Sequence, residues 1–208
     1  MTRPRRRFVA GLLAMTFAIG GVALGRVPAQ PAAGSQPERA TAIFAGGCFW
    51  CVEEAFDKVE GVLETTSGYI GGRVPNPTYE QVSAGQTGHT EAVRVTFDPA
   101  RVTYEALLEV FWRNIDPLDA GGQFCDRGDQ YRSAIFALTP EQQRMAQASR
   151  EQVAQQLGQP VATTIDAAQP FYTAEAYHQD YYQRNPVRYR FYKWNCGRAQ
   201  RLEEMWAR

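Results

Sequence analysis

The sequence predicts an α+β fold of two layers, in which helices pack on a mixed β-sheet. Short apolar or alternating segments typical of strands recur along the chain, separated by amphipathic segments with helical spacing. The chain has 208 residues, of which 44% are hydrophobic and 21% charged, enough for one domain with its own core. No internal repeat or second linker is present, so we expect a single folded domain over residues 40–208.

Residues 1–29 have the layout of a secretory signal peptide. Four arginines precede an apolar stretch over 8–25, and Val27-Pro28-Ala29 provides small residues for cleavage after Ala29. The letters "RRRFV" also resemble a twin-arginine signal. We therefore expect export, to the periplasm, with an uncleaved N-terminal membrane anchor as the alternative. Residues 30–39, rich in Pro, Gln and Ala, are expected to be a flexible leader.

Cleavage changes the charge of the protein. Five of the 22 basic residues lie in the first 29 positions and none of the 22 acidic ones, so the mature chain carries 17 against 22, a formal −5. This mild acidity argues against nucleic acid as a partner. No later segment is apolar and long enough to span a bilayer, so we expect no stable membrane insertion after cleavage. We also expect the protein to be a monomer.

The first half of the domain begins with an apolar strand over 40–45. Apolar residues at spacings of three and four then predict a helix over 48–59, which Gly61 ends. The remaining elements expected here are a strand over 62–72, a turn-rich stretch over 73–90 with a short helical piece near 79–84, and an alternating strand over 91–97.

The second half begins with an amphipathic helix over 103–115, with Thr103 as its N-cap. Thr139 and Pro140 open another helix, which runs to about residue 157. The other elements expected here are a long loop over 117–132, strands over 133–138 and 161–166, and a helix over 173–185. The aromatic and basic residues after 185 show no clear period, so we expect a long irregular C-terminal segment.

Four cysteines, Cys48, Cys51, Cys125 and Cys196, fall in the mature chain. An even number in an exported protein is compatible with structural disulfides, but four are few for a disulfide scaffold of this length. Cys48 follows Gly46-Gly47 at a junction between strand and helix, where free N–H groups and the helix dipole favour a thiolate. The sequence therefore predicts a nucleophilic Cys48 with a lowered pKa, beside an apolar wall made by Phe49 and Trp50.

Five blocks of residues carry a resemblance to a known family. They are "GCFW" at 47–50, "PNPTYEQV" at 75–82, "GHTEAV" at 88–93, "DRGDQYRSAI" at 126–135 and "LTPEQ" at 138–142. In this order they resemble the A-type peptide methionine sulfoxide reductases over nearly all of residues 40–196. The resemblance implies a ferredoxin-like, plait-type core and selectivity for the S epimer of methionine sulfoxide.

The resemblance also implies roles for particular residues. Cys48 would attack the sulfoxide sulfur, and Glu91 would protonate its oxygen if burial raises the pKa of the carboxyl group. The other expected site residues are Tyr79 and Tyr131, which would hold the oxygen, Asp126, which would orient the site, and Phe49 and Trp50, which would hold the ε-methyl group. His89 is expected to be structural, and His178 to lie on a helix surface.

Attack by Cys48 would leave a sulfenic acid, which a second cysteine usually converts to a disulfide. One common family pattern has two cysteines in a glycine-rich tail, whereas this tail contains only Cys196. We expect Cys196 to resolve the sulfenic acid. Cys51 is the alternative, because a Cys-x-x-Cys pair at a helix start can close a disulfide, and Cys125 is expected to be a neighbour without a part in the chemistry.

The expected reductant is a thioredoxin-like dithiol protein, and no metal or organic cofactor is required. Three other interpretations remain open at this point. The letters "CFWC" could belong to a thiol–disulfide oxidoreductase, the cysteines and histidines could bind zinc, or the aromatic tail could be the docking surface of a binding domain without enzyme activity.

Overall fold

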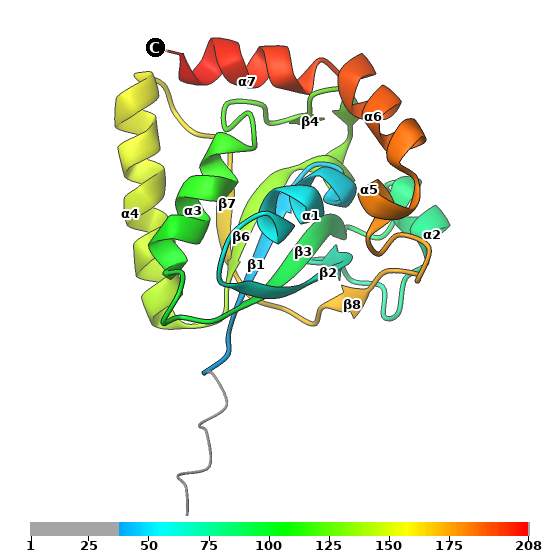
Figure 1. Cartoon of the computed structure of the whole chain (residues 1–208), viewed down its shortest axis with the longest axis horizontal. Helices are drawn as coiled ribbons and strands as arrows, with labels where there is room; N and C mark the ends of the chain where they lie inside the picture. The colour runs from blue at the N-terminus through cyan, green and yellow to red at the C-terminus, as the bar shows by residue number, and fades with distance from the viewer. Residues whose placement is uncertain (1–37, 208) are drawn as a thin grey trace, which may run out of the picture. The chain divides into compact units, whose positions relative to one another are not determined.

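The computed structural model describes residues 38–207, and the predictions for the signal peptide and most of the leader lie outside them. The main sheet has six strands, in the order β7-β6-β1-β3-β2-β8 (Figure 1). These strands are β1 (Ala40–Gly46), β2 (Val62–Ile70), β3 (Thr90–Phe97), β6 (Ser133–Ala137), β7 (Thr164–Ala167) and β8 (Tyr172–Thr173). A two-residue pair, β4 (Gly122–Gln123) and β5 (Asp126–Arg127), forms a separate ribbon.

The helices are α1 (Phe49–Asp57), α2 (Tyr79–Ser83), α3 (Tyr104–Arg113), α4 (Pro140–Leu157), α5 (Tyr181–Arg184), α6 (Pro186–Asn195) and α7 (Arg198–Trp206). A short 3₁₀ helix covers Asp129–Tyr131. None of the helices in the described part of the chain is both long and apolar enough to cross a membrane.

The four central strands have ferredoxin-like connections. The segments β1-α1-β2 and β3-α3-β6 each pass over one neighbouring strand, and all contacts among β6, β1, β3 and β2 are antiparallel. Helix α4 then crosses to β7, which pairs with β6 in parallel. This architecture confirms the predicted α+β fold with a plait-type core.

Strand alternation divides β1 between the two faces of the sheet. Phe44 stacks on Phe56 of α1 and Phe111 of α3, with ring centroids 4.8 and 5.3 Å apart. Ile43 points to the opposite face, where it belongs to a second buried cluster that Phe171, from the segment before β8, packs against. The helices α1, α3 and α4 therefore form one layer and the sheet the other, as the sequence predicts.

The predicted caps of two helices are present. The Thr103 hydroxyl accepts a hydrogen bond from the Ala106 N–H at 3.2 Å, and the Thr139 hydroxyl accepts one from the Gln142 N–H at 3.1 Å. Pro140 occupies the first helical position of α4. Local capping chemistry was therefore sufficient to locate the start of both helices.

The structure corrects two predictions near the C-terminus. The helix predicted over 173–185 is wrong, because Tyr172–Thr173 pairs with β2 and Asp180, with φ of 54°, begins only the short α5. The long irregular C-terminal segment is also wrong, since α6 and α7 occupy most of it. The two helices pass along the upper edge of the domain in Figure 1.

Tertiary contacts explain why α6 forms despite its weak periodicity. Pro186 starts the helix, and Tyr189 turns inward so that its hydroxyl donates to Glu54 of α1 at 2.6 Å. Lys193 forms an ion pair with the same carboxylate at 2.5 Å. These polar contacts replace the apolar stripe that a sequence analysis searches for.

Candidate active site

The turn before α1 is built for Cys48. Gly47 has φ of 82°, and a Cβ at this position would lie 2.5 Å from Cβ of Gln123. Glycine therefore meets both the conformation and the close contact. Cys48 follows as the N-cap of α1, so its side chain lies at the start of the helix, as the sequence predicts.

A pocket opens at this junction. It is lined by Cys48, Phe49, Trp50, Tyr79, Glu91, Asp126, Tyr131 and Tyr192. The structure thus brings together the residues that were predicted to attack, to protonate, to hold the oxygen, to orient the site and to hold the methyl group. They come from elements far apart in the sequence, namely the start of α1, α2, β3, β5 and the 3₁₀ helix. Among the predicted site residues, Cys51 and Cys196 do not line the pocket, and Tyr192 is an addition that the sequence analysis missed.

Glu91 is buried beneath the start of α1. Alternation along β3 places it on the helix-covered face with Val93 and Val95, and its side chain is only 2% exposed. Its Oε2 accepts a hydrogen bond from the Phe49 N–H at 3.0 Å. Burial nevertheless raises the pKa of Glu91 to about 8, so the carboxyl group holds its proton at neutral pH.

The predicted low pKa of Cys48 is wrong. The side chain is 6% exposed, and burial raises the pKa of its thiol, with the neighbouring Cys51 thiol and Glu91 carboxyl acting in the same direction. The first free N–H group of the helix donates to Glu91 rather than to sulfur. Burial therefore opposes the activation that the helix start was expected to give this thiol.

Tyr192 and Asp126 form one wall of the pocket together. The Tyr192 hydroxyl donates a hydrogen bond to Asp126, whose pKa is raised by burial. Tyr192 lines the pocket with Cys48 and acts to lower the pKa of its thiol, against the larger effect of burial. The only sequence signal for this residue is its spacing, since Tyr189, Tyr192 and Cys196 share one face of a helix that the sequence did not reveal.

Trp50 is held in place by His178. The indole Nε1 donates to His178 Nδ1 at 3.1 Å, and the ring of Tyr181 stacks on Trp50 with centroids 3.7 Å apart. His178 is 2% exposed and packs against Tyr79 at 4.4 Å. The prediction that it lies on a helix surface is wrong, because the chain folds as turns here and directs the imidazole beneath the aromatic wall.

His89 has the predicted structural role. Its Nδ1 accepts a hydrogen bond from the Gly72 N–H at 3.0 Å, so Nε2 carries the proton and donates to the Val74 carbonyl at 2.8 Å. Both ring nitrogens of His89 therefore form hydrogen bonds with the backbone of the segment after β2.

The four cysteines form two pairs. Cys125 and Cys196 are joined by a disulfide, with Cα atoms 4.8 Å apart, whereas Cys48 and Cys51 are free and buried. Cys125, which the sequence analysis expected to be a neighbour without a part in the chemistry, is therefore bonded through its sulfur to Cys196. Within residues 38–207, Cys125, Asp126 and Cys196 are the group with the spacing of metal ligands, and the bond between the two sulfurs makes them unsuited to zinc.

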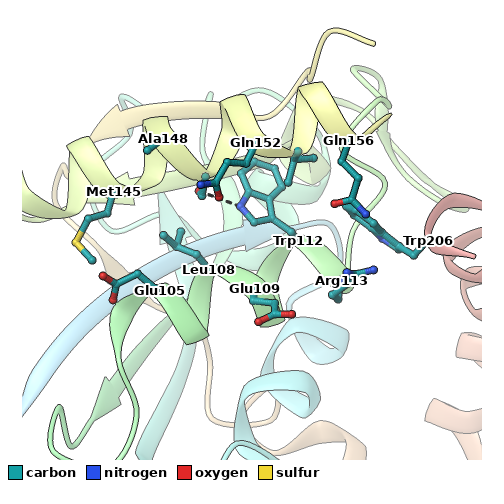
Figure 2. Close-up of a pocket in the computed structure, with 12 residues that line it drawn as sticks. Glu105, Leu108, Glu109, Trp112, Arg113, Met145, Ala148, Gln152, Gln156 and Trp206 are labelled. Carbon is teal, nitrogen blue, oxygen red and sulfur yellow. Dashed lines mark hydrogen bonds between the residues drawn. The ribbon is translucent and has the colours of Figure 1, made fainter. Parts of the chain in front are cut away.

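A larger hollow lies elsewhere on the domain, between α3 and α4 and beside Trp206 (Figure 2). Trp112 and Met145 give it an apolar floor, and the Arg113 guanidinium covers the Trp206 ring at 4.7 Å. No cysteine, histidine or tyrosine lines it. The smaller pocket at Cys48 is therefore the candidate active site, because groups able to perform chemistry converge there.

Comparisons with known proteins identify the family of the chain. The family model described as peptide methionine sulfoxide reductase matches residues 40–208. The chain is 51% identical over 176 residues to peptide methionine sulfoxide reductase MsrA 2 of Rhizobium meliloti (strain 1021), covering 85% of this chain and 87% of the relative.

Solved structures give the same result. Methionine sulfoxide reductase A of Corynebacterium diphtheriae has a TM-score of 0.69 and 35% identity, covering 74% of this chain and 78% of that one. Mxr1 from Saccharomyces cerevisiae in reduced form also has a TM-score of 0.69, with 30% identity and coverage of 72% and 87%. Mxr1 in complex with Trx2 shares the fold, with a TM-score of 0.50, 22% identity and coverage of 69% and 85%.

Proposed function

The chain belongs to the peptide methionine sulfoxide reductase family, and we propose that it reduces methionine S-sulfoxide in oxidised proteins and peptides through attack of Cys48 on sulfur. The observation that carries this proposal is the convergence of a buried thiol, a protonated carboxyl group and three phenols in one pocket. A thiol–disulfide oxidoreductase would need the two thiols but not the acid beside them.

The acid meets the main difficulty of the reaction, since oxide cannot leave sulfur without a proton. Glu91, whose burial raises its pKa to about 8, donates to the sulfoxide oxygen while Tyr79 and Tyr131 hold it by hydrogen bonds. Cys48 bonds to the substrate sulfur and gives up its thiol proton, which replaces the proton that Glu91 donated. This bond then breaks as the protonated oxygen passes to the Cys48 sulfur and the electron pair stays on the methionine sulfur. The net step converts the thiol and the sulfoxide into Cys48 sulfenic acid and a thioether, so the proton and the oxygen are both accounted for.

The aromatic wall supplies selectivity for the methyl group. The rings of Phe49 and Trp50 lie 6.4 Å apart at the pocket, and Trp50 is fixed by His178 and Tyr181. An ε-methyl group against these rings directs the sulfoxide oxygen toward the hydroxyl and carboxyl groups. The preference for the S epimer follows from membership of the family.

The sulfenic acid must then be returned to a thiol. A second cysteine converts it to a disulfide, and a thioredoxin-like dithiol protein reduces that disulfide. Cys196, the residue favoured by the sequence, and Cys51 are the candidates for the first of these steps. Cys125 is exposed, so the Cys125–Cys196 disulfide offers an accessible sulfur to an external reductant. The cycle as proposed uses no metal or organic cofactor.

We also propose that residues 1–29 direct export and that the mature protein acts in the periplasm as a monomer. A basic segment followed by an apolar stretch and small residues supports this. Mass spectrometry of the protein recovered from the periplasmic fraction should give an N-terminus at Gln30. Recovery of the uncleaved chain with the membrane would instead establish an N-terminal anchor.

The activity is tested by incubating the protein with a racemic methionine sulfoxide peptide and dithiothreitol, and separating the epimers by chiral chromatography. We expect loss of the S epimer alone and a matching gain of methionine. A Cys48→Ser variant serves as the control for non-enzymatic reduction. If neither epimer decreased, the sulfoxide reductase proposal would be wrong, and the Cys48/Cys51 pair should be tested as a disulfide oxidoreductase.

A further inference from the structure

The pocket at Cys48 is too small to hold a polypeptide. Its volume is about 110 Å³, whereas pockets that enclose a drug-sized ligand measure roughly 300–1,000 Å³. It accommodates the end of a methionine sulfoxide side chain and little of the main chain that carries it. Any contact that distinguishes a polypeptide substrate from a free amino acid therefore lies outside the pocket.

Three exposed apolar side chains lie on the helix that forms one wall of this pocket. Val187, Phe191 and Trp194 of α6 are 72%, 66% and 76% exposed, and they are the three most exposed large apolar side chains within residues 38–207. Their spacing of four and three residues places them on one side of the helix. We call these three residues the α6 stripe. The opposite side of the helix carries Tyr192, which lines the pocket. Exposed apolar surface of this kind marks an interaction site.

Positive charge flanks the α6 stripe. Arg188 and Arg190 are exposed, one on each side of it, and neither forms an ion pair with another residue in the described part of the chain. The helix contains no acidic residue, although residues 30–208 as a whole carry 17 basic and 22 acidic side chains. The stripe is therefore complementary to a partner that presents apolar side chains beside carboxylates.

A chain whose methionine sulfoxide occupies the pocket can reach the stripe. Tyr192 of the pocket wall and Phe191 of the stripe are consecutive, so their Cα atoms are about 3.8 Å apart. A helix with its side chains is about 10–12 Å across, and an extended peptide advances about 3.3 Å per residue. Roughly three to five residues of substrate therefore cover the distance over the helix from the pocket to the stripe.

The protein reductant has a different point of approach. The exposed sulfur of the Cys125–Cys196 disulfide is that of Cys125, which lies between β4 and β5 and not on α6. Cys196 itself is on the side of α6 that carries Tyr192, opposite to the stripe. The position of the disulfide thus leaves the α6 stripe free for the substrate.

We propose that the α6 stripe binds flexible segments of the oxidised polypeptide, rich in apolar and acidic side chains, while their methionine sulfoxide enters the pocket. This inference rests on the proposed function and names its substrate class as unfolded or loosely folded chains, which can bend over the helix. Because these contacts are made far from the reacting atoms, they stabilise the bound substrate and the transition state equally. The stripe therefore lowers KM and leaves kcat unchanged.

The test compares three substrates with dithiothreitol as the reductant, so that docking of a protein reductant does not enter the rate. The first is a peptide of about 15 residues with a central methionine S-sulfoxide between leucines and glutamates, long enough to cross α6. The second has serine in place of leucine and lysine in place of glutamate. The third is N-acetylmethionine S-sulfoxide, which is too short to reach the stripe.

Two variants change the stripe and its flanks, Phe191→Ser/Trp194→Ser and Arg188→Glu/Arg190→Glu. Leu138→Ser is the matched control. Its side chain is 43% exposed, and it follows the end of β6 that lies away from the site, because the other end pairs with Gly46. All substituted side chains are exposed, so we expect every variant to fold.

Phe191→Ser/Trp194→Ser should lower kcat/KM for the apolar, acidic peptide about tenfold or more, through KM alone. The value for N-acetylmethionine S-sulfoxide should stay within about twofold of wild type. Arg188→Glu/Arg190→Glu should lower kcat/KM for the same peptide about threefold or more and raise it for the basic peptide. Leu138→Ser should leave all three values unchanged.

Unchanged kinetics of the peptide in Phe191→Ser/Trp194→Ser, or an equal loss on all three substrates, would overturn the inference. So would a loss seen only when a thioredoxin-like protein replaces dithiothreitol, which would assign the stripe to the reductant. Unchanged peptide kinetics together with lost sedimentation on phosphatidylglycerol vesicles would assign it to a membrane surface. If the wild type reduced none of the three substrates, the proposed function itself would be wrong.

Discussion

The two cysteine pairs of this domain occupy different environments. Cys48 and Cys51 are buried at the first turn of α1, among a protonated carboxyl group and aromatic rings. Cys125 is exposed and Cys196 half-buried, at a short ribbon and the end of α6. Under the proposed function, the inner pair has the surroundings for oxygen transfer, and the outer pair has a sulfur that a protein reductant can reach.

This difference follows from one physical conflict. Burial keeps Glu91 protonated by excluding water, because the charged carboxylate is poorly solvated there. The same burial prevents a folded reductant from reaching Cys48. A second pair at the surface resolves the conflict, since thiol–disulfide exchange moves electrons between sites that differ in accessibility.

The largest expected effect comes from the inner nucleophile. Cys48→Ser should abolish sulfoxide reduction, by on the order of 10⁴-fold or more, because a neutral hydroxyl cannot replace sulfur in either bond formation or oxygen acceptance. Methionine formation with dithiothreitol, measured by chromatography, checks this. Cys125→Ser is the matched control from the outer pair and should still release the first equivalent of methionine. Residual turnover in Cys48→Ser would assign the nucleophile elsewhere.

The next effect separates chemistry from recycling. Cys196→Ser should form one equivalent of methionine per enzyme and then stop when a thioredoxin-like protein is the reductant. Dithiothreitol, which is small enough to enter the pocket, should restore multiple turnovers. Rapid-quench measurement of methionine against enzyme concentration gives both quantities. Full cycling with the protein reductant would mean that it reaches the inner pair directly.

The sequence alone predicted those features of the fold that depend on local patterns of residues. Alternation and helical spacing predicted α1 and the strands β1, β2, β3 and β6, and Thr103 and Thr139 predicted helix starts, because these signals act over a few residues. The pocket residues were grouped only through resemblance to a family. Nothing local in the strand sequence around Glu91 indicates that it would lie beneath Cys48.

The sequence failed where distant contacts decide the outcome. Helix α6 is fixed by Tyr189 and Lys193 on Glu54, which lies 135 positions from Tyr189, so its aromatic and basic residues gave no usable period. Tyr192 was missed for the same reason. The raised pKa of Cys48 was also missed, since the helix-start argument counts N–H groups but not the burial that opposes them.

The third prediction concerns the acid. Glu91→Gln keeps the hydrogen bond from the Phe49 N–H but removes the proton, so kcat/KM should fall about 10²–10³-fold. In wild type, activity requires the protonated carboxyl group and should fall as the pH rises through about 8. Steady-state kinetics from pH 6 to 9.5 should show this alkaline decline in wild type and its loss in Glu91→Gln. An unchanged decline in the variant would assign it to another group.

The same substitution should stabilise the fold at neutral pH. An unfolded glutamate releases its proton near pH 4.5, whereas folded Glu91 retains it to about pH 8. Between these values the folded state binds more protons, so the free energy of unfolding decreases as pH rises. Glu91→Gln removes this cost, a gain on the order of 2–3 kcal/mol at pH 7 that should vanish at pH 4. Urea denaturation at both pH values measures it, and equal gains at both would exclude the titration of Glu91 as the cause.

The smallest expected effect tests the wall between the two pairs. Tyr192→Phe removes the hydrogen bond to Asp126 and the phenol beside Cys48, and kcat/KM should fall roughly tenfold, the usual consequence of losing one hydrogen bond to a charged group. Tyr182→Phe is the control, since its hydroxyl donates to Asp57 at 3.0 Å and does not line the pocket.

Tyr192 lies on the same face of α6 as Cys196, so removal of its hydroxyl should affect two rates differently: oxygen transfer at Cys48, and disulfide exchange between the two cysteine pairs. Oxygen transfer should slow because the phenol that acts to lower the pKa of Cys48 is lost. Exchange between the pairs should not slow, and should become faster if the wall limits it, because Asp126 and the end of α6 are no longer tied together. Rapid-quench mapping of the two disulfides separates these rates. Equal slowing of both would show that Tyr192 supports the packing of α6 as a whole and does not divide the inner pair from the outer one.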